Sequence, residues 1–199
     1  IKTIHVTRDL NSLKILTDSE QMYTGSTIIP EITVREADTG KLLKEYTDYK
    51  IYYQNQSGQA IAEIKNIGNY KVVVKGSGDY TGSKELFVHV VRSVEDLNIS
   101  LTESHDYTGS AIDPQLSVTE PETGYKLQKD TDYTVIYKNA AGEAVSVIQE
   151  AGSYTVVITG TGDYTGEVTR TIYVIRPGDI SQLTVSGLDP LTFTGKAVK

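Results

Sequence analysis

The chain has 199 residues, a formal net charge of -7 and no Cys. The acidic balance leaves no basic patch for phosphates, so we expect no nucleic-acid partner. The absence of Cys excludes disulfides, thiolate metal sites and cysteine nucleophiles. No apolar stretch is long enough for a signal peptide or a membrane span, so we expect no membrane insertion in this sequence.

The chain contains two similar segments, in which matching motifs lie 84 positions apart. Tyr23-Thr24-Gly25-Ser26 returns as Tyr107-Thr108-Gly109-Ser110, and Gly78-Asp79-Tyr80-Thr81-Gly82 returns as Gly162-Asp163-Tyr164-Thr165-Gly166. Roughly two positions in five are identical without gaps, which indicates a tandem array.

The alignment divides the chain into four parts. Residues 9–92 form repeat 1 and residues 93–177 form repeat 2. Residues 1–8 match the end of a repeat and are predicted to be the last strand of a preceding one. Residues 178–199, with Phe193-Thr194-Gly195 in the Tyr-Thr-Gly position, are predicted to begin a third repeat. We therefore expect the sequence to be cut from a longer array.

Alternating apolar and polar side chains predict about seven short strands in each repeat. In repeat 1 they are expected near residues 13–17, 32–36, 41–45, 49–54, 60–66, 70–75 and 84–91. Gly-containing turns separate them, and no segment has helical periodicity. The predicted fold class is all-β, with tandem Ig-like β-sandwich domains of about seven strands each. A β-grasp-like module is the alternative, although that fold needs a helix.

The faces of the predicted strands can be assigned from both copies. Tyr49, Ile51 and Tyr53 alternate with outward residues, and their counterparts in repeat 2 are also apolar. A Gly-x-Tyr spacing at Tyr70 and Tyr154 is typical of a tyrosine corner, in which the hydroxyl donates to nearby backbone. The corner favours a sandwich, while the absence of Trp and Cys departs from antibody domains.

The repeated pattern resembles a family. Tyr-Thr-Gly-Ser-x-Ile-x-Pro, Thr-Asp-Tyr, Gly-x-Tyr-x-Val-Val and Gly-x-Gly-Asp-Tyr-Thr-Gly are similar to the tandem extracellular repeats of large bacterial surface proteins. These repeats are grouped as Ig-like or mostly β-grasp modules and occur in adhesin stalks. The resemblance covers both repeats and the two end segments.

The resemblance implies a non-catalytic spacer of an exported, extracellular cell-surface protein, a stalk that presents a functional head. Its implied partners are the neighbouring repeats of the same chain. One alternative is an adhesin module that binds a host glycan or protein. Another is an accessory segment of a large extracellular hydrolase.

Tyrosines are the candidate ligand contacts, because exposed Tyr rings stack on sugars and occur in protein interfaces. The Tyr52-Tyr53 pair of the less acidic repeat 1 is the first candidate. The tyrosines and glycines of the repeated motifs are predicted to be structural, with rings that cap the core, hydroxyls that reach water or backbone, and glycines at positive φ. These residues are Tyr23, Gly25, Tyr70, Tyr80, Gly82, Tyr107, Gly109, Tyr154, Tyr164 and Gly166.

No catalytic residue, cofactor or metal site is expected. His5 and His89 occupy the same position in different repeats and should lie one repeat apart. Nothing in the sequence places Glu36 and Asp48 in a cleft that would perturb their pKa values for acid–base work. Gly76-Ser77-Gly78 precedes no helix, which argues against a phosphate loop.

The two repeats differ in charge. Repeat 1 has a net charge of -1 and repeat 2 a net charge of -8, and no Lys of repeat 1 has a Lys counterpart in repeat 2. A Lys crosslink common to both repeats is therefore excluded. The difference also predicts that the repeats share a fold but no charged site.

Overall fold

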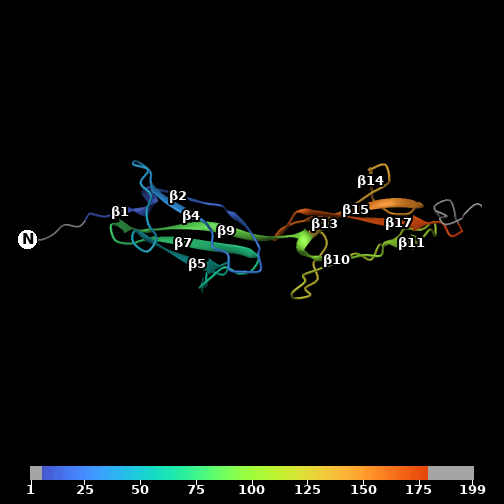
Figure 1. Cartoon of the computed structure of the whole chain (residues 1–199), viewed down its shortest axis with the longest axis horizontal. Coiled ribbons are helices and arrows are strands. Elements are labelled where there is room, and N and C mark those ends of the chain that lie inside the picture. The colour runs from blue at the N-terminus through green and yellow to red at the C-terminus, as the bar shows by residue number, and fades with distance from the viewer. Residues whose placement is uncertain (1–5, 179–199) are drawn as a thin grey trace, which may run out of the picture.

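The structure is a computed structural model that describes residues 6–178. Residues 179–199 of the predicted third repeat (178–199), and residues 1–5 of the predicted last strand of a preceding repeat (1–8), lie outside this range. The described chain is all-β, with two short 3-10 helices, η1 (Leu10–Ser12) and η2 (Val94–Asp96), and no α-helix in the described range. Two similar β modules follow one another along a single long axis (Figure 1).

Repeat 1 is built on one large mixed sheet. Its strands and the short strands beside it are β1 (Arg8–Asp9), β2 (Leu13–Thr17), β3 (Glu20–Met22), β4 (Ile32–Glu36), β5 (Tyr49–Asn55), β6 (Ala60–Ile61), β7 (Gly68–Gly76), β8 (Tyr80–Thr81) and β9 (Ser83–Ser93). The antiparallel order is β9-β7-β5-β6, and β3 joins the edge of β9 in parallel. Strands β2 and β4 form a separate antiparallel pair.

Repeat 2 has the same plan. Its strands are β10 (Asn98–Ser100), β11 (Ser104–Asp106), β12 (Ser117–Thr119), β13 (Tyr133–Lys138), β14 (Ala144–Val145), β15 (Gly152–Gly160), β16 (Tyr164–Thr165) and β17 (Glu167–Ile175). The large sheet has the order β11-β17-β15-β13-β14, and β10 pairs with β12. Register is conserved at the 84-residue offset: Ile51 opposes Val74, and Val135 opposes Ile158.

The core of each repeat lies between the large sheet and the two-stranded pair. In repeat 1, Leu13 of β2, Val34 of β4 and Val74 of β7 are buried in one apolar cluster. In repeat 2, Val118 of β12 and Val156 of β15 are buried in the corresponding cluster. Burial of each such side chain contributes about 1.5 to 3 kcal/mol, so the alternation read from the sequence sets the packing face.

Two predicted strands are wrong in extent. Residues 41–45 form only isolated bridges, from Leu42 to Arg35 and from Glu45 to Tyr49, because the chain turns there at Tyr46 with a positive φ. The strand expected at 60–66 is limited to Ala60–Ile61, after which Ile64 makes a single bridge to Ile28. The short parallel strands β1, β3, β8, β11 and β16 were not predicted, since two or three residues carry no periodicity.

The Gly-x-Tyr prediction is confirmed in both repeats. The Tyr70 hydroxyl donates to the carbonyl of Asn66 at 2.9 Å, and the Tyr154 hydroxyl donates to the carbonyl of Glu150 at 2.9 Å. Each bond ties the start of a central strand to the segment that leads into it. Tyr154 is nearly buried, so both its ring and its hydroxyl contribute to stability.

We therefore expect Tyr154→Phe to destabilise repeat 2 by about 1 kcal/mol through the lost hydrogen bond. Tyr154→Ala should cost about 3 to 5 kcal/mol, because it also leaves a cavity. Urea denaturation measures both values. Tyr52→Phe, on an exposed ring, is the control and should change nothing; equal costs for Phe and Ala at position 154 would contradict the assignment.

Candidate functional site

Within residues 6–178, a well-defined polar site lies at the joint between the repeats. Strand β9 runs without interruption to Ser93, and its last two residues, Arg92 and Ser93, pair in parallel with Tyr164 and Thr165 of β16. The Arg92 N–H donates to the Asp163 carbonyl at 2.9 Å. The predicted division between residues 92 and 93 thus falls inside one strand, which pairs with β7 of repeat 1 and with β16 of repeat 2.

Arg92 is the centre of this joint. Its side chain is only 6% exposed and donates two hydrogen bonds to the Glu122 carboxylate, at 2.7 and 2.8 Å. Its guanidinium lies 4.8 Å from the centre of the Tyr23 ring. Glu122 belongs to repeat 2 and Tyr23 to repeat 1, so one arginine bridges both. A two-pronged bond to a carboxylate and stacking on a ring both suit the planar guanidinium and not a Lys ammonium.

The ion pair shifts both groups toward their charged forms. The hydrogen bonds from Arg92 lower the pKa of Glu122, and the same bonds raise the pKa of Arg92 against the opposing effect of burial. The Arg92 Nε is buried without a partner among the described residues, so the guanidinium is held by its two terminal nitrogens.

Further contacts connect the two repeats. His89 Nε2 lies 2.7 Å from Asp163 Oδ1, which links β9 to the turn before β16. Ile67 of repeat 1 packs against the apolar core of repeat 2. A surface hollow of about 460 Å³ lies beside the joint, lined by Tyr23, Thr24, Gly25, Arg92, Asp96, Pro121 and Glu122.

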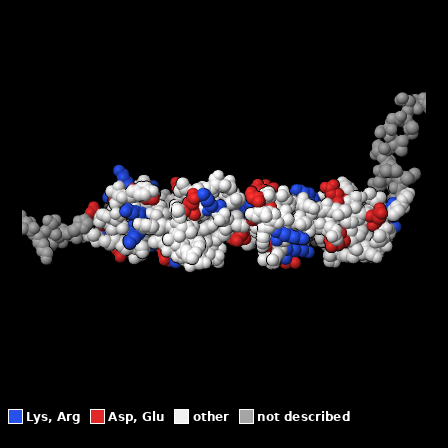
Figure 2. Space-filling view, turned by 90° about the horizontal axis from the view of Figure 1, so that it is seen from below, with Lys and Arg blue, Asp and Glu red and all other residues white. Residues whose placement is uncertain are grey.

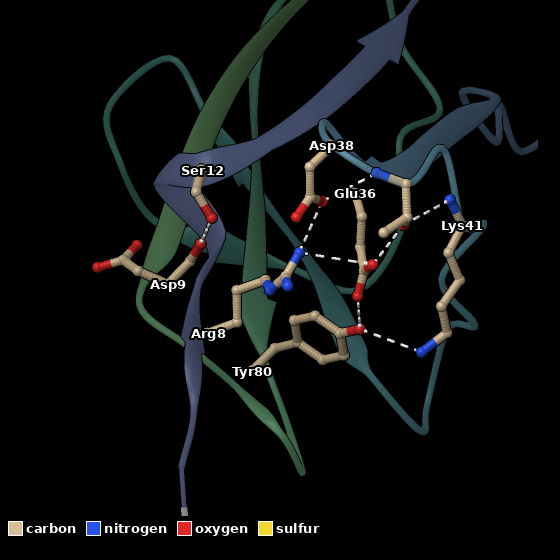
Figure 3. A network of polar contacts seen from close by, with 8 residues as sticks. Arg8, Asp9, Ser12, Glu36, Asp38, Lys41 and Tyr80 are labelled. Carbon is tan, nitrogen blue, oxygen red and sulfur yellow. Dashed lines mark hydrogen bonds and ion pairs between the residues drawn. The ribbon is translucent and has the colours of Figure 1, made fainter.

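The same arrangement is found at the start of repeat 1, in a more open form (Figure 3). Arg8 and Asp9 pair in parallel with Tyr80 and Thr81, as Arg92 and Ser93 do with β16. Arg8 Nη1 lies 2.8 Å from Asp38 Oδ1 and 3.5 Å from Glu36 Oε2. The Arg8 side chain is 42% exposed, against 6% for Arg92.

In both repeats a buried tyrosine bonds to one of the two acidic residues that face the arginine. We call this acidic pair and its tyrosine the receiving side of the joint. The Tyr80 hydroxyl donates to Glu36 at 2.7 Å and accepts from Lys41 at 3.3 Å. In repeat 2 the Tyr164 hydroxyl donates to Glu120 at 2.9 Å. Burial first, and then the neighbouring carboxylate, raise the pKa of both phenols, so they stay neutral donors.

The far end of repeat 2 carries the other half of the same joint, an arginine that lies over a Tyr ring of its own repeat. We call this half the outgoing side. Arg176 lies 4.1 Å from the centre of the Tyr107 ring, as Arg92 lies over Tyr23. Its guanidinium is 3.8 Å from Glu150 of its own repeat and is half exposed. Arg8, Arg92 and Arg176 thus occupy one position in successive repeats.

Four tyrosines of the predicted structural motifs lie at this joint. Tyr23 and Tyr107 stack against arginines on the outgoing side, and Tyr80 and Tyr164 donate to glutamates on the receiving side. The prediction that these hydroxyls reach water or backbone is wrong for Tyr80 and Tyr164, because each donates to an acidic side chain, Glu36 or Glu120. Tyr70 and Tyr154 form the corners described above.

The motif glycines have positive φ, as predicted: Gly25, Gly82, Gly109 and Gly166. The conformation matters most at Gly82 and Gly166, where the incoming strand passes close by. A Cβ on Gly82 would lie 3.0 Å from Asp9 Oδ1, and one on Gly166 would lie 3.1 Å from Ser93 Oγ. Both backbone conformation and space favour Gly there.

The prediction that the repeats share no charged site is wrong. Glu36 and Glu120 are equivalent, as are Asp38 and Glu122, and each acidic pair faces an equivalent arginine. Net charge hid this site because the differences between the repeats lie elsewhere on the surface. The signal in the sequence was the arginine that recurs every 84 residues at positions 8, 92 and 176.

The candidate ligand pair Tyr52-Tyr53 is divided between two faces of the sheet. Tyr53 packs against the core, while Tyr52 is 48% exposed on the outer face. Phe87 of β9 lies on that outer face, 67% exposed, with the Lys71 ammonium 5.9 Å from its ring centre. Tyr52 therefore lies on the same open face as Phe87 and Lys71, and Tyr53 lies on the opposite face.

The residues considered for catalysis are not brought together. Glu36 bonds to Tyr80, while the Asp48 carboxylate accepts the Lys44 backbone N–H at 2.9 Å and closes a turn. Among residues 6–178 no group of three or more His, Asp or Glu side chains is arranged to hold a metal ion. No helix in the described range is long and apolar enough to cross a membrane.

On the face shown in Figure 2, Lys and Arg side chains and Asp and Glu side chains form small separate groups along the rod.

The chain matches no protein-family model, and no curated protein matches it.

Arg92→Ala should destabilise the chain by about 2 kcal/mol, because packing and charged hydrogen bonds are lost together. Arg92→Lys should recover only part of this loss, since an ammonium neither stacks nor bonds in two places. The equivalent Arg8→Ala is the control and should cost less, because Arg8 is partly exposed. Urea denaturation gives the order; equal costs at the two positions would contradict the role of the buried joint.

The joint should also weaken in acid. The pKa of Glu122 is lowered in the folded state, so its contribution is complete above the unfolded value of about 4.3 and is lost as the pH falls below it. We expect Glu122→Gln to abolish this part of the acid destabilisation and to leave stability near pH 7 lower than in the parent. Unfolding curves between pH 3 and pH 8 measure it, and identical pH profiles for parent and variant would contradict it.

Proposed function

We propose that the chain is a non-catalytic spacer from the stalk of an exported bacterial cell-surface protein, in which tandem Ig-like β-sandwich domains hold a functional head away from the cell. The observation that carries the proposal is the repeated joint. Each repeat ends in an arginine that stacks on its own tyrosine and is placed to bond to an acidic pair of the repeat that follows.

The Ig-like assignment is supported by the layers of each repeat. A two-stranded antiparallel pair packs over a larger sheet, and a tyrosine corner opens a central strand. The β-grasp alternative is disfavoured because the described chain contains no α-helix to pack on the sheet.

A spacer function is supported by the stiffness expected of the joint. A continuous strand, a buried arginine and an apolar contact from Ile67 all connect the same two repeats. Such contacts restrict bending, because opening the joint would break the two Arg92–Glu122 hydrogen bonds and expose the apolar contact of Ile67. The partner proposed for the exposed Arg176–Tyr107 end is a following repeat of the same kind.

A second function, adhesion through repeat 1, is favoured by the open sheet face. Tyr52 and Phe87 expose their rings on the same face of the sheet, and the Lys71 ammonium lies near the Phe87 ring, a combination that suits stacking on a host glycan or contact with a protein. A third proposal, an accessory segment of a large extracellular hydrolase, rests only on the resemblance of the repeats.

Small-angle scattering tests the rod. A 199-residue globule has a radius of gyration of about 16 Å, while two 84-residue units in line should give roughly 21 to 24 Å. Arg92→Ala should broaden the distribution of interatomic distances by allowing the joint to bend, whereas Arg8→Ala should not. A value near 16 Å for the parent chain would overturn the spacer proposal.

Location is tested separately. An antibody raised against residues 6–178 should label intact, unpermeabilised cells of the source organism. Labelling only after permeabilisation would contradict the surface assignment, and it would leave the scattering result for the rod unaffected.

A further inference from the structure

At the edge of each large sheet, a short early strand runs parallel to the last strand of the same repeat. In repeat 1 the short strand β3 pairs with β9 in parallel, with Glu20 opposite His89 and Met22 opposite Val91. In repeat 2, β11 pairs with β17 in the same way, with Ser104 opposite Tyr173 and Asp106 opposite Ile175. Both are early strands of a repeat laid beside its last strand.

Hydrogen bonds close each pairing at both ends. In repeat 1 the His89 N–H donates to the Ser19 carbonyl and the Tyr23 N–H donates to the Val91 carbonyl, each at 2.8 Å. In repeat 2 the Tyr173 N–H donates to Glu103 and the Tyr107 N–H donates to Ile175, each at 2.7 Å.

We infer that these two parallel pairings are mechanical clamps, which make each repeat resist tension along the chain. The chain enters a repeat at one end of the long axis and leaves it at the other (Figure 1). Tension therefore pulls β3 and β9 in opposite directions along their own length. Hydrogen bonds between parallel strands run roughly across that direction, so all of them are loaded at once in shear.

Within each repeat, the clamp is the shorter of the two pairings that the last strand makes. Strand β9 pairs with β7 over eight residue pairs but with β3 over three. In repeat 2, β17 likewise pairs with β15 over eight residue pairs and with β11 over three. Once the shorter pairing fails, the early strands separate from the sheet and expose the core, so the clamp sets the force at which a repeat unfolds.

The joint adds to this arrangement without replacing it. Arg8–Asp9 with β8, and Arg92–Ser93 with β16, are also parallel pairs at the point where tension enters each repeat. They contain two residue pairs each and open without releasing the core. The inference depends on strand direction and not on the location of the protein. Its test is therefore independent of the proposed spacer function.

Single-molecule force spectroscopy on the full chain, held by its two ends, tests the clamp. In the parallel ladder alternate N–H groups face β9; since that of Tyr23 does, that of Gln21 does too, and that of Met22 points away. Gln21→Pro removes a clamp bond, whereas Met22→Pro on the same strand removes none.

The parent should show two unfolding events at similar force, one from each repeat. Gln21→Pro should move one event to lower force, with the unfolding rate at fixed force raised about fivefold for one lost hydrogen bond of about 1 kcal/mol. Met22→Pro should leave both events in place. Two unchanged events with Gln21→Pro, or an equal loss with Met22→Pro, would overturn the inference.

A change of pulling direction tests the same bonds without a proline. The chain has no Cys, so Thr24→Cys with Glu95→Cys provides two unique handles, on exposed residues that follow β3 and β9. Force applied there peels the pairing one bond at a time. Repeat 1 should then unfold at a clearly lower force than in the end-to-end pull, and an equal or higher force would sink the clamp.

Discussion

The strand that closes one repeat is also the strand that opens the next, and this constraint organises the molecule. Residues 83–91 of β9 complete the sheet of repeat 1, and residues 92–93 pair with repeat 2. Since the backbone does not turn between them, the two sheets are held in line rather than folded onto each other. The Arg92 side chain then has one repeat on each side of it, which is why it is buried although most arginines are not.

A buried arginine is stable only where its charge has favourable partners, and the two repeats that meet at the joint each provide one. Its own Tyr-Thr-Gly segment provides a ring, and the following repeat provides the Glu122 carboxylate, with the nearby Glu120 held by the buried Tyr164 hydroxyl. The two most obvious motifs of the sequence are therefore the two halves of one contact. Their recurrence explains how repeats with very different net charge retain the same joint.

The apolar alternation, the repeat length and the tyrosine corners were all readable from the sequence. Each depends on residues close together in the chain, or on a pattern that appears twice and so filters out chance. The strand at 41–45 was overestimated because the local pattern contains no sign of the turn at Tyr46. The Tyr52-Tyr53 pair was grouped because the residues are adjacent, although adjacent residues of a strand face opposite ways.

The sequence by itself determined that this protein is all-β, that it is a tandem repeat, and which side chains of its longer strands face the core. Only the tertiary structure decided the joint and the parallel edge strands. Arg92 and Glu122 are 30 residues apart and Tyr23 is farther still, so nothing local connects them. Parallel pairing of β3 with β9 joins segments at opposite ends of a repeat, and strand direction leaves no trace in composition or periodicity.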